Sequence, residues 1–377
     1  MKEKYSIPKK HYYKGDVNRI PVGRKKKTIA VVLVALLFII AAAGVGVWVL
    51  RDRFAPDTRA GMAEELEAAP FKMTVLDVGQ GLGVLIEADG EYMLYDGGGR
   101  DTSSKYVSYL KNYGVENVKY LVASHYDDDH LSGLIGALHT FNVGTVLCPD
   151  YVCETAIYSS FKEATEGREV LHPTTGDGFT LGNAEITVLS PKKGKTYEKE
   201  NDYSLAIMIK YGSFSAVLTG DAEAEAEKDM ISSGLLSKCN IYVAGHHGSA
   251  SSSSEKFMKK ISPKSVIISV GKDNAYSHPA DTVLECFEKL DSEVYRTDTM
   301  GSITCLSDGE FYTVKLKAAD MPDGTDAAYV INTRTGKFHK PDCDSVYDMS
   351  EHNKLYTNES REALIEQGYS PCGACKP

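Results

Sequence analysis

Cysteine is sparse in this chain, with eight in 377 residues, and this excludes a small scaffold held together by disulfides. Basic residues are also sparse over most of the length. Residues 1–54 carry 12 of the 42 Lys and Arg and 3 of the 52 Asp and Glu, so residues 55–377 carry 30 against 49. The resulting net charge of −19 counts against non-specific binding along a nucleic-acid backbone. An apolar share of 42% excludes a wholly disordered chain.

The basic N-terminus precedes a long apolar run. Thr28–Leu50 contains no charged residue and has about the 20 residues that a membrane-spanning helix needs. Because basic residues lie on its N-terminal side, the positive-inside rule predicts a single-pass protein of the cell membrane. Residues 1–27 would form a cytoplasmic tail, and the rest would be extracellular. The alternative is a cleaved signal peptide with an apolar core at 29–40.

The remainder divides into two folded units. Residues 51–70 are predicted to form a stalk, 71–317 the main domain, 318–327 a linker and 328–377 a small C-terminal unit. In the main domain, short β-rich runs alternate with segments of helical spacing, which predicts an α/β layered fold. The helical segments lie at 104–113, 131–140, 223–232, 255–261 and 281–290.

Metal-ligating residue types are concentrated after the apolar run 120–123. His125, Asp127, Asp129 and His130 fall within six positions, and imidazole together with carboxylate suits Zn²⁺, Mn²⁺ or Fe²⁺. A turn with alternating side chains would direct the first two at one ion and the last two at another. The alternative is a solvated acidic turn that caps the following helix.

Further candidate ligands follow other predicted strands. Asp221 ends an apolar strand, where it would serve as a bridging ligand or as a helix N-cap. His246 and His247 follow the next strand, and we expect only one to bind metal, because adjacent side chains of extended chain point in opposite directions. His278 follows a further strand.

Taken together, these motifs resemble the metallo-β-lactamase superfamily, and within it the hydrolase domain of ComEC-type competence proteins. The resemblance covers about residues 71–317. It implies a four-layer αββα sandwich whose two mixed sheets share an edge that carries the metal site. The matching motifs are Leu76–Gly81, Asp96–Gly98, His125–His130, Gly220–Asp221, Gly245–Ser249 and His278–Pro279.

The resemblance also implies roles for these residues. His125, Asp127 and one of His246 and His247 would hold the first ion, and Asp129 and His130 the second, with Asp221 between the two. We take His246 as the ligand. Asp129, His247 and His278 are then the candidates for proton transfer or phosphate binding. Asp77 and Asp96 would orient the ligands.

The sequence departs from the family pattern at three places. Asp127 replaces the usual His, which favours an oxygen-preferring ion such as Mn²⁺. The His expected shortly before Asp221 is missing, and Asn201, Asp202 and Ser204 lie near its place. Leu82 stands where ComEC-like domains tend to have an acid.

The C-terminal unit has a second candidate site. His339, Cys343, Cys372 and Cys375 have the spacing of a structural Zn²⁺ site, and a unit of this size needs such a staple. It resembles the small metal-binding domain of the Ada repair protein and is expected to be zinc-ribbon-like. The alternatives are a disulfide from Cys372 to Cys375 or to Cys343. A Cys148–Cys153 disulfide is also considered, whereas Cys239, Cys286 and Cys305 are predicted core residues.

The function expected from these observations is a membrane-anchored extracellular hydrolase of phosphodiesters, with DNA or RNA as substrate. Two divalent ions (Zn or Mn) would serve the main domain and one structural Zn the C-terminal unit. A hydrolase of a small phosphoester or lactone-like substrate is the second hypothesis. The third is a non-catalytic surface binding module with a degenerate metal site. No obligate protein partner is inferred.

Overall fold

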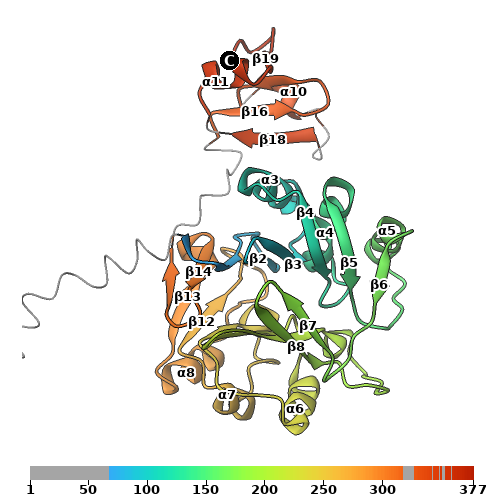
Figure 1. Ribbon diagram of the computed structural model, residues 1–377, viewed down its shortest axis with the longest axis vertical. Helices are drawn as coiled ribbons and strands as arrows, with labels where there is room; N and C mark the ends of the chain where they lie inside the picture. The colour runs from blue at the N-terminus through green and yellow to red at the C-terminus, as the bar shows by residue number, and fades with distance from the viewer. Residues whose placement is uncertain (1–67, 317–326, 342, 348, 350–352, 358) are drawn as a thin grey trace, which may run out of the picture. The chain divides into compact units, whose positions relative to one another are not determined.

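The computed structural model describes residues 68–316 and 327–377, apart from 342, 348, 350–352 and 358 (Figure 1). The main domain begins with strand β1 at Phe71 and ends with strand β15 at Lys315. The predicted cytoplasmic tail, membrane helix and most of the stalk and linker lie outside the described residues. Among the residues that are described, no helix is long and apolar enough to cross a bilayer.

One sheet of the main domain has eight strands in the order β15-β14-β1-β2-β3-β4-β5-β6. Pairing is antiparallel from β15 to β3 and parallel from β3 to β6, so the sheet is mixed. Its strands are β1 (Phe71–Val75), β2 (Gly83–Ala88), β3 (Glu91–Gly97), β4 (Asn117–Val122), β5 (Asn142–Leu147), β6 (Glu169–Leu171), β14 (Ile303–Ser307) and β15 (Tyr312–Lys315).

The other sheet has seven strands in the order β13-β12-β11-β10-β9-β8-β7 and is also mixed. β10 to β13 are parallel, and β7 to β10 pair antiparallel. Its strands are β7 (Gly178–Leu181), β8 (Ala184–Ser190), β9 (Ala206–Tyr211), β10 (Phe214–Leu218), β11 (Ile241–Val243), β12 (Ser265–Ile268) and β13 (Glu293–Arg296).

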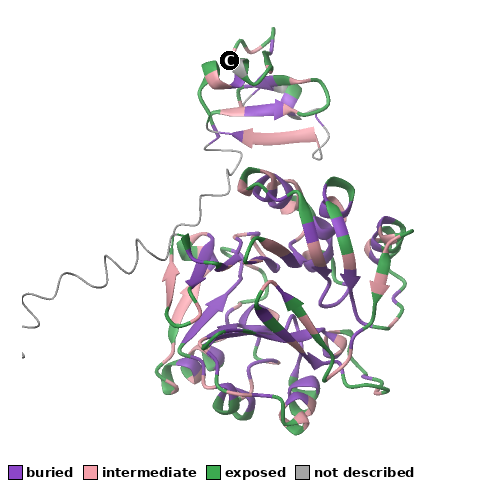
Figure 2. Cartoon of the chain, in the orientation of Figure 1, coloured by how far each residue is buried: buried purple, intermediate pink, exposed green. Residues whose placement is uncertain are grey.

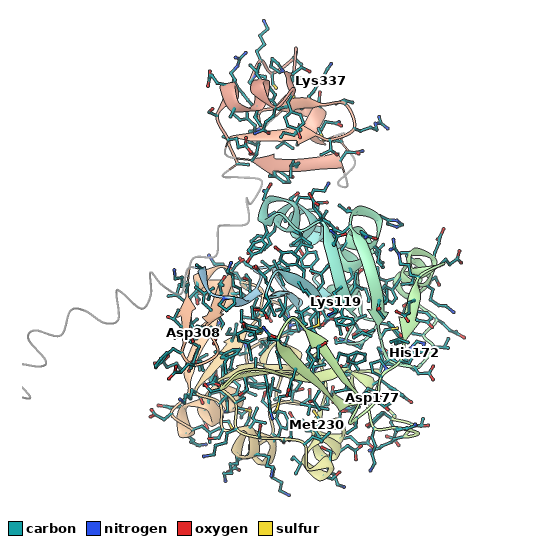
Figure 3. The ribbon with its side chains drawn as sticks, in the orientation of Figure 1. Lys119, His172, Asp177, Met230, Asp308 and Lys337 are labelled. Atoms are coloured by element: carbon teal, nitrogen blue, oxygen red, sulfur yellow. The ribbon has the colours of Figure 1, made fainter. Side chains whose placement is uncertain are left out.

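Three hydrophobic cores separate four layers. One core lies between the sheets, and alternation along each strand builds it: Val84 and Ile86 face this core, whereas Leu85 faces the helices. A second core lies under the helices of the first sheet and a third under those of the second (Figure 2). Met230, labelled in Figure 3, is fully buried in the third. The predicted αββα sandwich is confirmed.

The outer helices form two groups, which Figure 1 shows on opposite sides of the sheets. Those of the first sheet are α3 (Ser103–Tyr113), α4 (Asp128–Thr140) and α5 (Ala156–Thr165). Those of the second are α6 (Ala224–Ser233), α7 (Glu255–Ile261) and α8 (Asp281–Lys289), and the short helix α9 (Thr297–Met300) follows β13. The five predicted helical segments correspond to α3, α4, α6, α7 and α8.

Two differences from the sequence-based expectation matter. The helix α5 was not predicted, because its Ile, Ser and Thr residues have modest helix propensity. It is instead stabilised by the Thr155 side chain, which accepts a hydrogen bond from the N–H of Tyr158, and by burial of Phe161. The helix α4 begins at Asp128 rather than at 131, so Asp129 and His130 belong to its first turn.

The C-terminal unit has its own four-stranded sheet, in the order β18-β16-β17-β19. Its elements are β16 (Tyr329–Asn332), β17 (Lys337–His339), α10 (Asp344–Tyr347), β18 (Lys354–Thr357), α11 (Arg361–Glu366) and β19 (Ser370–Pro371). Two small apolar clusters form its core, one around Phe338 and one around Cys343 and Cys372. Because so little apolar surface is buried, a unit of this size needs an additional source of stability, such as a bound metal ion.

Candidate metal centre

The candidate ligands follow the ends of strands in both sheets. His125 and Asp127 follow β4 of the first sheet, Asp221 follows β10 of the second, and His246 and His247 follow β11. The carboxyl ends of neighbouring parallel strands lie at one edge of a sheet, where α/β proteins commonly place their sites. Sequence positions more than a hundred residues apart therefore meet.

A close backbone contact fixes helix α4 against the end of β3. A Cβ atom on Gly133 would lie 1.9 Å from the carbonyl oxygen of Gly97, and one on Gly97 would lie 2.4 Å from the N–H nitrogen of Leu134. Only glycine permits so short a separation between the helix and the strand. This contact brings the first turn of α4, with Asp129 and His130, next to Asp96 at the end of β3.

Asp96 organises the buried part of the site. Its Oδ2 atom lies 2.8 Å from His130 Nδ1 and 2.7 Å from the hydroxyl of Ser124, while Oδ1 accepts the Ser124 N–H at 2.7 Å. The Ser124 hydroxyl lies 3.0 Å from His125 Nδ1. Nδ1 of each histidine is thus engaged, which directs Nε2 of each into the site. Asp96 was expected in this role; Ser124 was not, although it directly precedes His125.

Asp129, His130 and His247 form one group of converging ligand atoms, all within 4.8 Å of one another. The Nε2 atom of His247 lies 3.3 Å from His130 Nε2 and 3.4 Å from Asp129 Oδ2. Its Nδ1 atom lies 3.0 Å from the Ser269 carbonyl oxygen, which fixes the ring. We expected Asp129 and His130 to share an ion, and the structure adds His247 to them.

His125, His130 and Asp221 form a second group of ligand atoms within 4.8 Å of one another. All three side chains are buried. Asp127 adjoins this group, with its Oδ2 atom 3.5 Å from His125 Nε2, and its side chain is half exposed. Asp221 lies 3.3 Å from His130 through Oδ1 and 3.6 Å from His247 through Oδ2, so it stands between the groups as expected for a bridging ligand.

Of the two adjacent histidines, the structure groups His247 with other candidate ligands. We took His246 as the ligand, but it belongs to neither group; its Nε2 atom lies 3.6 Å from Asp221 Oδ2, and its Nδ1 atom lies 3.2 Å from the hydroxyl of Ser251. The expectation assumed extended chain, whereas both residues have positive φ, 51° and 56°. This left-handed turn, and not strand alternation, decides which ring enters the centre.

The residues fit divalent metal. His125 Nε2 and Asp221 Oδ1 are buried and lack a hydrogen-bond partner, as expected for atoms whose lone pairs serve an ion. Burial alone would lower the pKa of His130, but the carboxylates of Asp221 and Asp96 raise that pKa well above its ordinary value. Burial would raise the pKa of Asp221, but the imidazoles of His130 and His247 hold it well below its ordinary value. Clustered carboxylates of this kind need cations.

The missing histidine has no direct replacement. Asp202 is buried and its Oδ1 atom accepts the N–H groups of Glu223 and Ala226, so it caps helix α6. The Ser204 hydroxyl accepts the N–H of Asp221, and Asn201 donates to Glu223. In the described part of the chain, neither group of ligand atoms includes them.

His278 lies beside the centre without joining either group. Its ring centroid is 5.6 Å from that of His246, in an edge-on arrangement, and its Nδ1 atom is buried without a hydrogen-bond partner. Burial lowers the pKa of this imidazole, and the neighbouring His246 lowers it further. Asp77, expected to orient a ligand, accepts the N–H of Gly79 at 3.2 Å.

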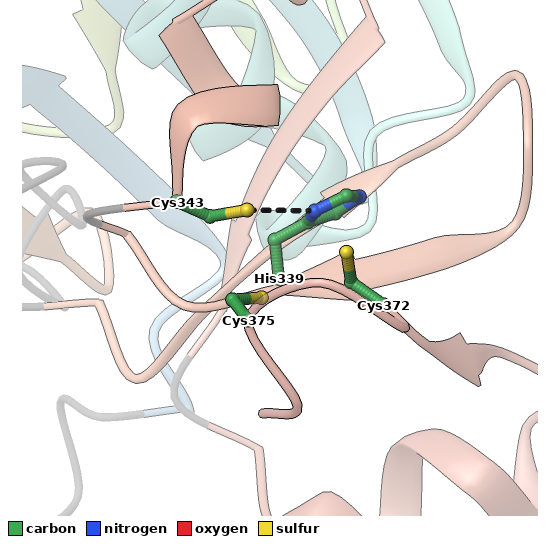
Figure 4. A group of neighbouring side chains, drawn as sticks. All are labelled: His339, Cys343, Cys372 and Cys375. Carbon is green, nitrogen blue, oxygen red and sulfur yellow. Dashed lines mark hydrogen bonds between the residues drawn. The ribbon is translucent and has the colours of Figure 1, made fainter.

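The C-terminal unit brings its four predicted ligands together (Figure 4). The ligand atoms of His339, Cys343, Cys372 and Cys375 lie within 4.8 Å of one another. The Cys343 sulfur lies 3.5 Å from His339 Nδ1, and the N–H of Lys340 donates to the Cys375 sulfur at 3.4 Å. Three sulfurs and one imidazole suit tetrahedral Zn²⁺.

All eight cysteines of the chain lie among the described residues, and all are free thiols. The disulfide alternatives for Cys343, Cys372 and Cys375 are therefore wrong, and Cys148 and Cys153 are not paired. Cys239 and Cys305 are buried in hydrophobic cores as predicted, whereas Cys286 is only partly buried.

Comparison with known proteins identifies a family and several relatives. The model of the metallo-beta-lactamase superfamily matches residues 76–272. ComE operon protein 3 of Bacillus subtilis is 29% identical over 252 residues, which cover 62% of this chain and 32% of that protein. Recombination protein 2 of Haemophilus influenzae is 31% identical over 245 residues, covering 64% and 29%. The chain thus spans about a third of the length of these relatives.

Among solved structures, a metal-dependent hydrolase of the beta-lactamase superfamily aligns with a TM-score of 0.42 and 15% identity, over 60% of this chain and 95% of the other.

Proposed function

The chain belongs to the metallo-β-lactamase superfamily and is a metal-dependent hydrolase related to competence proteins, and we propose that it hydrolyses phosphodiester bonds of nucleic acid. The observation that carries the proposal is the convergence of His125, His130 and Asp221 with Asp129 and His247 at one edge of the sandwich. Two adjoining groups of imidazole and carboxylate atoms suit a pair of divalent ions, and paired ions are characteristic of phosphoryl-transfer sites.

Each group has its own proposed part in metal binding. Asp129, His130 and His247 would hold one ion; His125 and Asp127 would hold the other, with Asp221 shared. Two such ions supply an activated water nucleophile and neutralise developing charge on a phosphoryl oxygen. The ion held by His125, Asp127 and Asp221 would have three protein ligands, whereas the ion held by Asp129, His130, His247 and the shared Asp221 would have four.

The protein's own groups account for the movement of protons. Asp129 is partly exposed, and its carboxylate can orient a water molecule and accept its proton. His278 is the candidate to protonate the leaving oxygen, because its ring lies beside His246 and its Nδ1 atom has no protein partner. His247, which the sequence also offers for this role, is proposed as a metal ligand because its Nε2 atom lies among those of Asp129 and His130.

The relatives' names support nucleic acid as the substrate. Recombination protein 2 is named for recombination, which is a reaction of DNA. The net charge of −19 over residues 55–377 favours the second candidate, a small phosphoester or lactone-like substrate, because a polyanion is repelled by an acidic surface. Residues 28–50 are proposed to anchor the protein in the cell membrane with the hydrolase outside.

Hydrolysis assays distinguish these candidates. The purified protein would be supplied with Mn²⁺ or Zn²⁺ and offered single- and double-stranded DNA, RNA and a bis-aryl phosphate. We expect metal-dependent cleavage of nucleic acid that the His125→Ala/Asp129→Ala double variant abolishes. Cleavage of the bis-aryl phosphate alone would favour the small substrate, and no metal-dependent turnover would favour a binding module.

A further inference from the structure

An aromatic side chain is held in solvent near the metal centre. Tyr276 is 68% exposed, and among the large hydrophobic residues of the described chain only Val152, at 78%, is more so. It belongs to the loop 271–278, which follows β12 at the same edge as the metal ligands. Its position beside the metal ligands, and not its exposure alone, makes it a candidate contact for substrate.

A chain of ring contacts connects Tyr276 to the metal centre. Its ring stacks on that of His278, with centroids 5.7 Å apart and planes at 26°. His278 in turn meets His246 edge-on at 5.6 Å, and His246 Nε2 lies 3.6 Å from Asp221 Oδ2. One face of the Tyr276 ring is therefore supported by His278, while the residue as a whole remains 68% exposed.

The loop that carries Tyr276 is preorganised. The side-chain amide of Asn274 makes four hydrogen bonds: it donates to the carbonyl oxygens of Gly271 and His278 and accepts the N–H groups of Tyr276 and His278. At its start, the N–H of Gly271 donates to Gln80 Oε1 at 3.1 Å. A ring held in place before binding loses little conformational entropy when a ligand stacks on it.

We propose that Tyr276 is the stacking platform for an unpaired nucleobase next to the phosphodiester that is cleaved, which makes single-stranded DNA or RNA the substrate. The inference rests on the proposed function and narrows it. A base inside a duplex has no free face, whereas every unpaired base can stack on an aromatic ring. Stacking of one base contributes about 1–3 kcal/mol, and this contribution does not depend on basic residues.

The test compares substrates with and without bases. Full-length protein with Mn²⁺ would cleave a single-stranded oligonucleotide, and the same oligonucleotide with abasic residues on both sides of the cleaved bond. Tyr276→Ala is expected to raise KM on the normal oligonucleotide by about 10-fold, the effect of losing one base stack. Because Tyr276 also stacks on His278, any change in kcat should be the same on both oligonucleotides. KM on the abasic oligonucleotide should not change, and Tyr276→Phe should retain wild-type values.

Phe311→Ala is the matched control. Phe311 is 49% exposed in the turn between β14 and β15. That turn lies at the far end of the first sheet, because Ser307 pairs with Phe71 at the start of β1 while Ile303 pairs with Val75 next to the site. Removal of the Phe311 ring should leave KM unchanged on both oligonucleotides.

Other results overturn the inference in distinguishable ways. An equal rise of KM on both oligonucleotides would mean that Tyr276 only supports its loop, and a fall in kcat at constant KM would place it in the chemistry. Faster cleavage of duplex than of single strands would also refute it. If the wild-type protein cleaves no nucleic acid at all, the proposed function fails as well.

Discussion

The Nε2 atoms of His130 and His247 lie 3.3 Å apart, although 117 positions separate the two residues. His130 belongs to the first turn of α4, which packs on the first sheet, and His247 follows β11 of the second sheet. Two imidazole nitrogens that face each other at this distance, with Asp129 and Asp221 beside them, form a site that joins the two halves of the sandwich.

The two adjacent histidines should differ in their effect on metal content. We expect His247→Ala to lose about one ion per chain, because its Nε2 atom lies among the ligand atoms of Asp129 and His130. His246→Ala should retain both ions, since His246 belongs to neither group of ligand atoms. Elemental analysis after dialysis measures this, and the opposite pattern would restore the original assignment.

The carboxylate of Asp127 should set the choice of metal. Replacing it by imidazole exchanges an oxygen ligand for nitrogen, so Asp127→His is expected to shift preference from Mn²⁺ toward Zn²⁺ by about 10-fold or more. The measurement is the ratio of activities, and of binding constants, with the two metals. An unchanged ratio would show that Asp127, half exposed, does not contact the ion.

Gly133→Ala should destabilise the domain. The new methyl group would overlap the Gly97 carbonyl oxygen, at 1.9 Å, and relieving that overlap must move α4 away from β3. We expect a loss of about 1–3 kcal/mol or more in the free energy of unfolding, together with weaker metal binding. Gly136→Ala, one turn further along the helix, is the control: its methyl would meet only the end of the Val107 side chain. Equal stability of the two variants in denaturant titration would contradict this account.

Glu227 should make stability depend on pH. Its carboxylate accepts the N–H groups of Ser253 and Ser254 at the start of α7, and burial raises its pKa from 4.5 to about 7. Since the folded protein holds this proton more tightly than the unfolded chain, the stabilisation is complete below pH 4.5 and is lost as the pH rises through 7.

Glu227→Gln should remove this dependence, which amounts to about 3 kcal/mol between pH 4 and 8. Denaturant titrations across that range provide the measurement. Glu225→Gln, on the exposed side of the same helix, is the control and should keep the wild-type slope. A slope that persists in Glu227→Gln would assign the effect to other groups.

The four-residue cluster of the C-terminal unit should hold one zinc ion. Cys372→Ser is expected to reduce zinc by about one per chain and to make residues 327–377 susceptible to proteolysis, since so small a core is not stable alone. Cys286→Ser, which alters a cysteine outside the cluster, should retain the zinc. If the two variants contained equal amounts of zinc, the four-residue cluster would not be a zinc site.

Motif reading could identify the fold and the residues that gather at the site, because their order along the chain already indicates strand ends. It could not establish which of these side chains contact one another in the folded protein. The left-handed turn at His246 and His247 could not be predicted, because non-glycine residues rarely adopt positive φ and nothing in the local sequence requires it. Likewise, the use of Asp202 as a helix cap rather than a ligand follows from the position of α6, a tertiary contact that spacing does not reveal.

The turn at His246 and His247 also implies a conflict between the stability of the folded protein and its ability to bind metal. Two successive non-glycine residues with positive φ each cost about 1–3 kcal/mol, a strain that glycine would not incur. Substitution by glycine is therefore expected to increase the stability of the folded protein at both positions. At the second position, however, it would remove the His247 ring, which completes a metal-binding group. Stabilisation should be sought elsewhere in the chain.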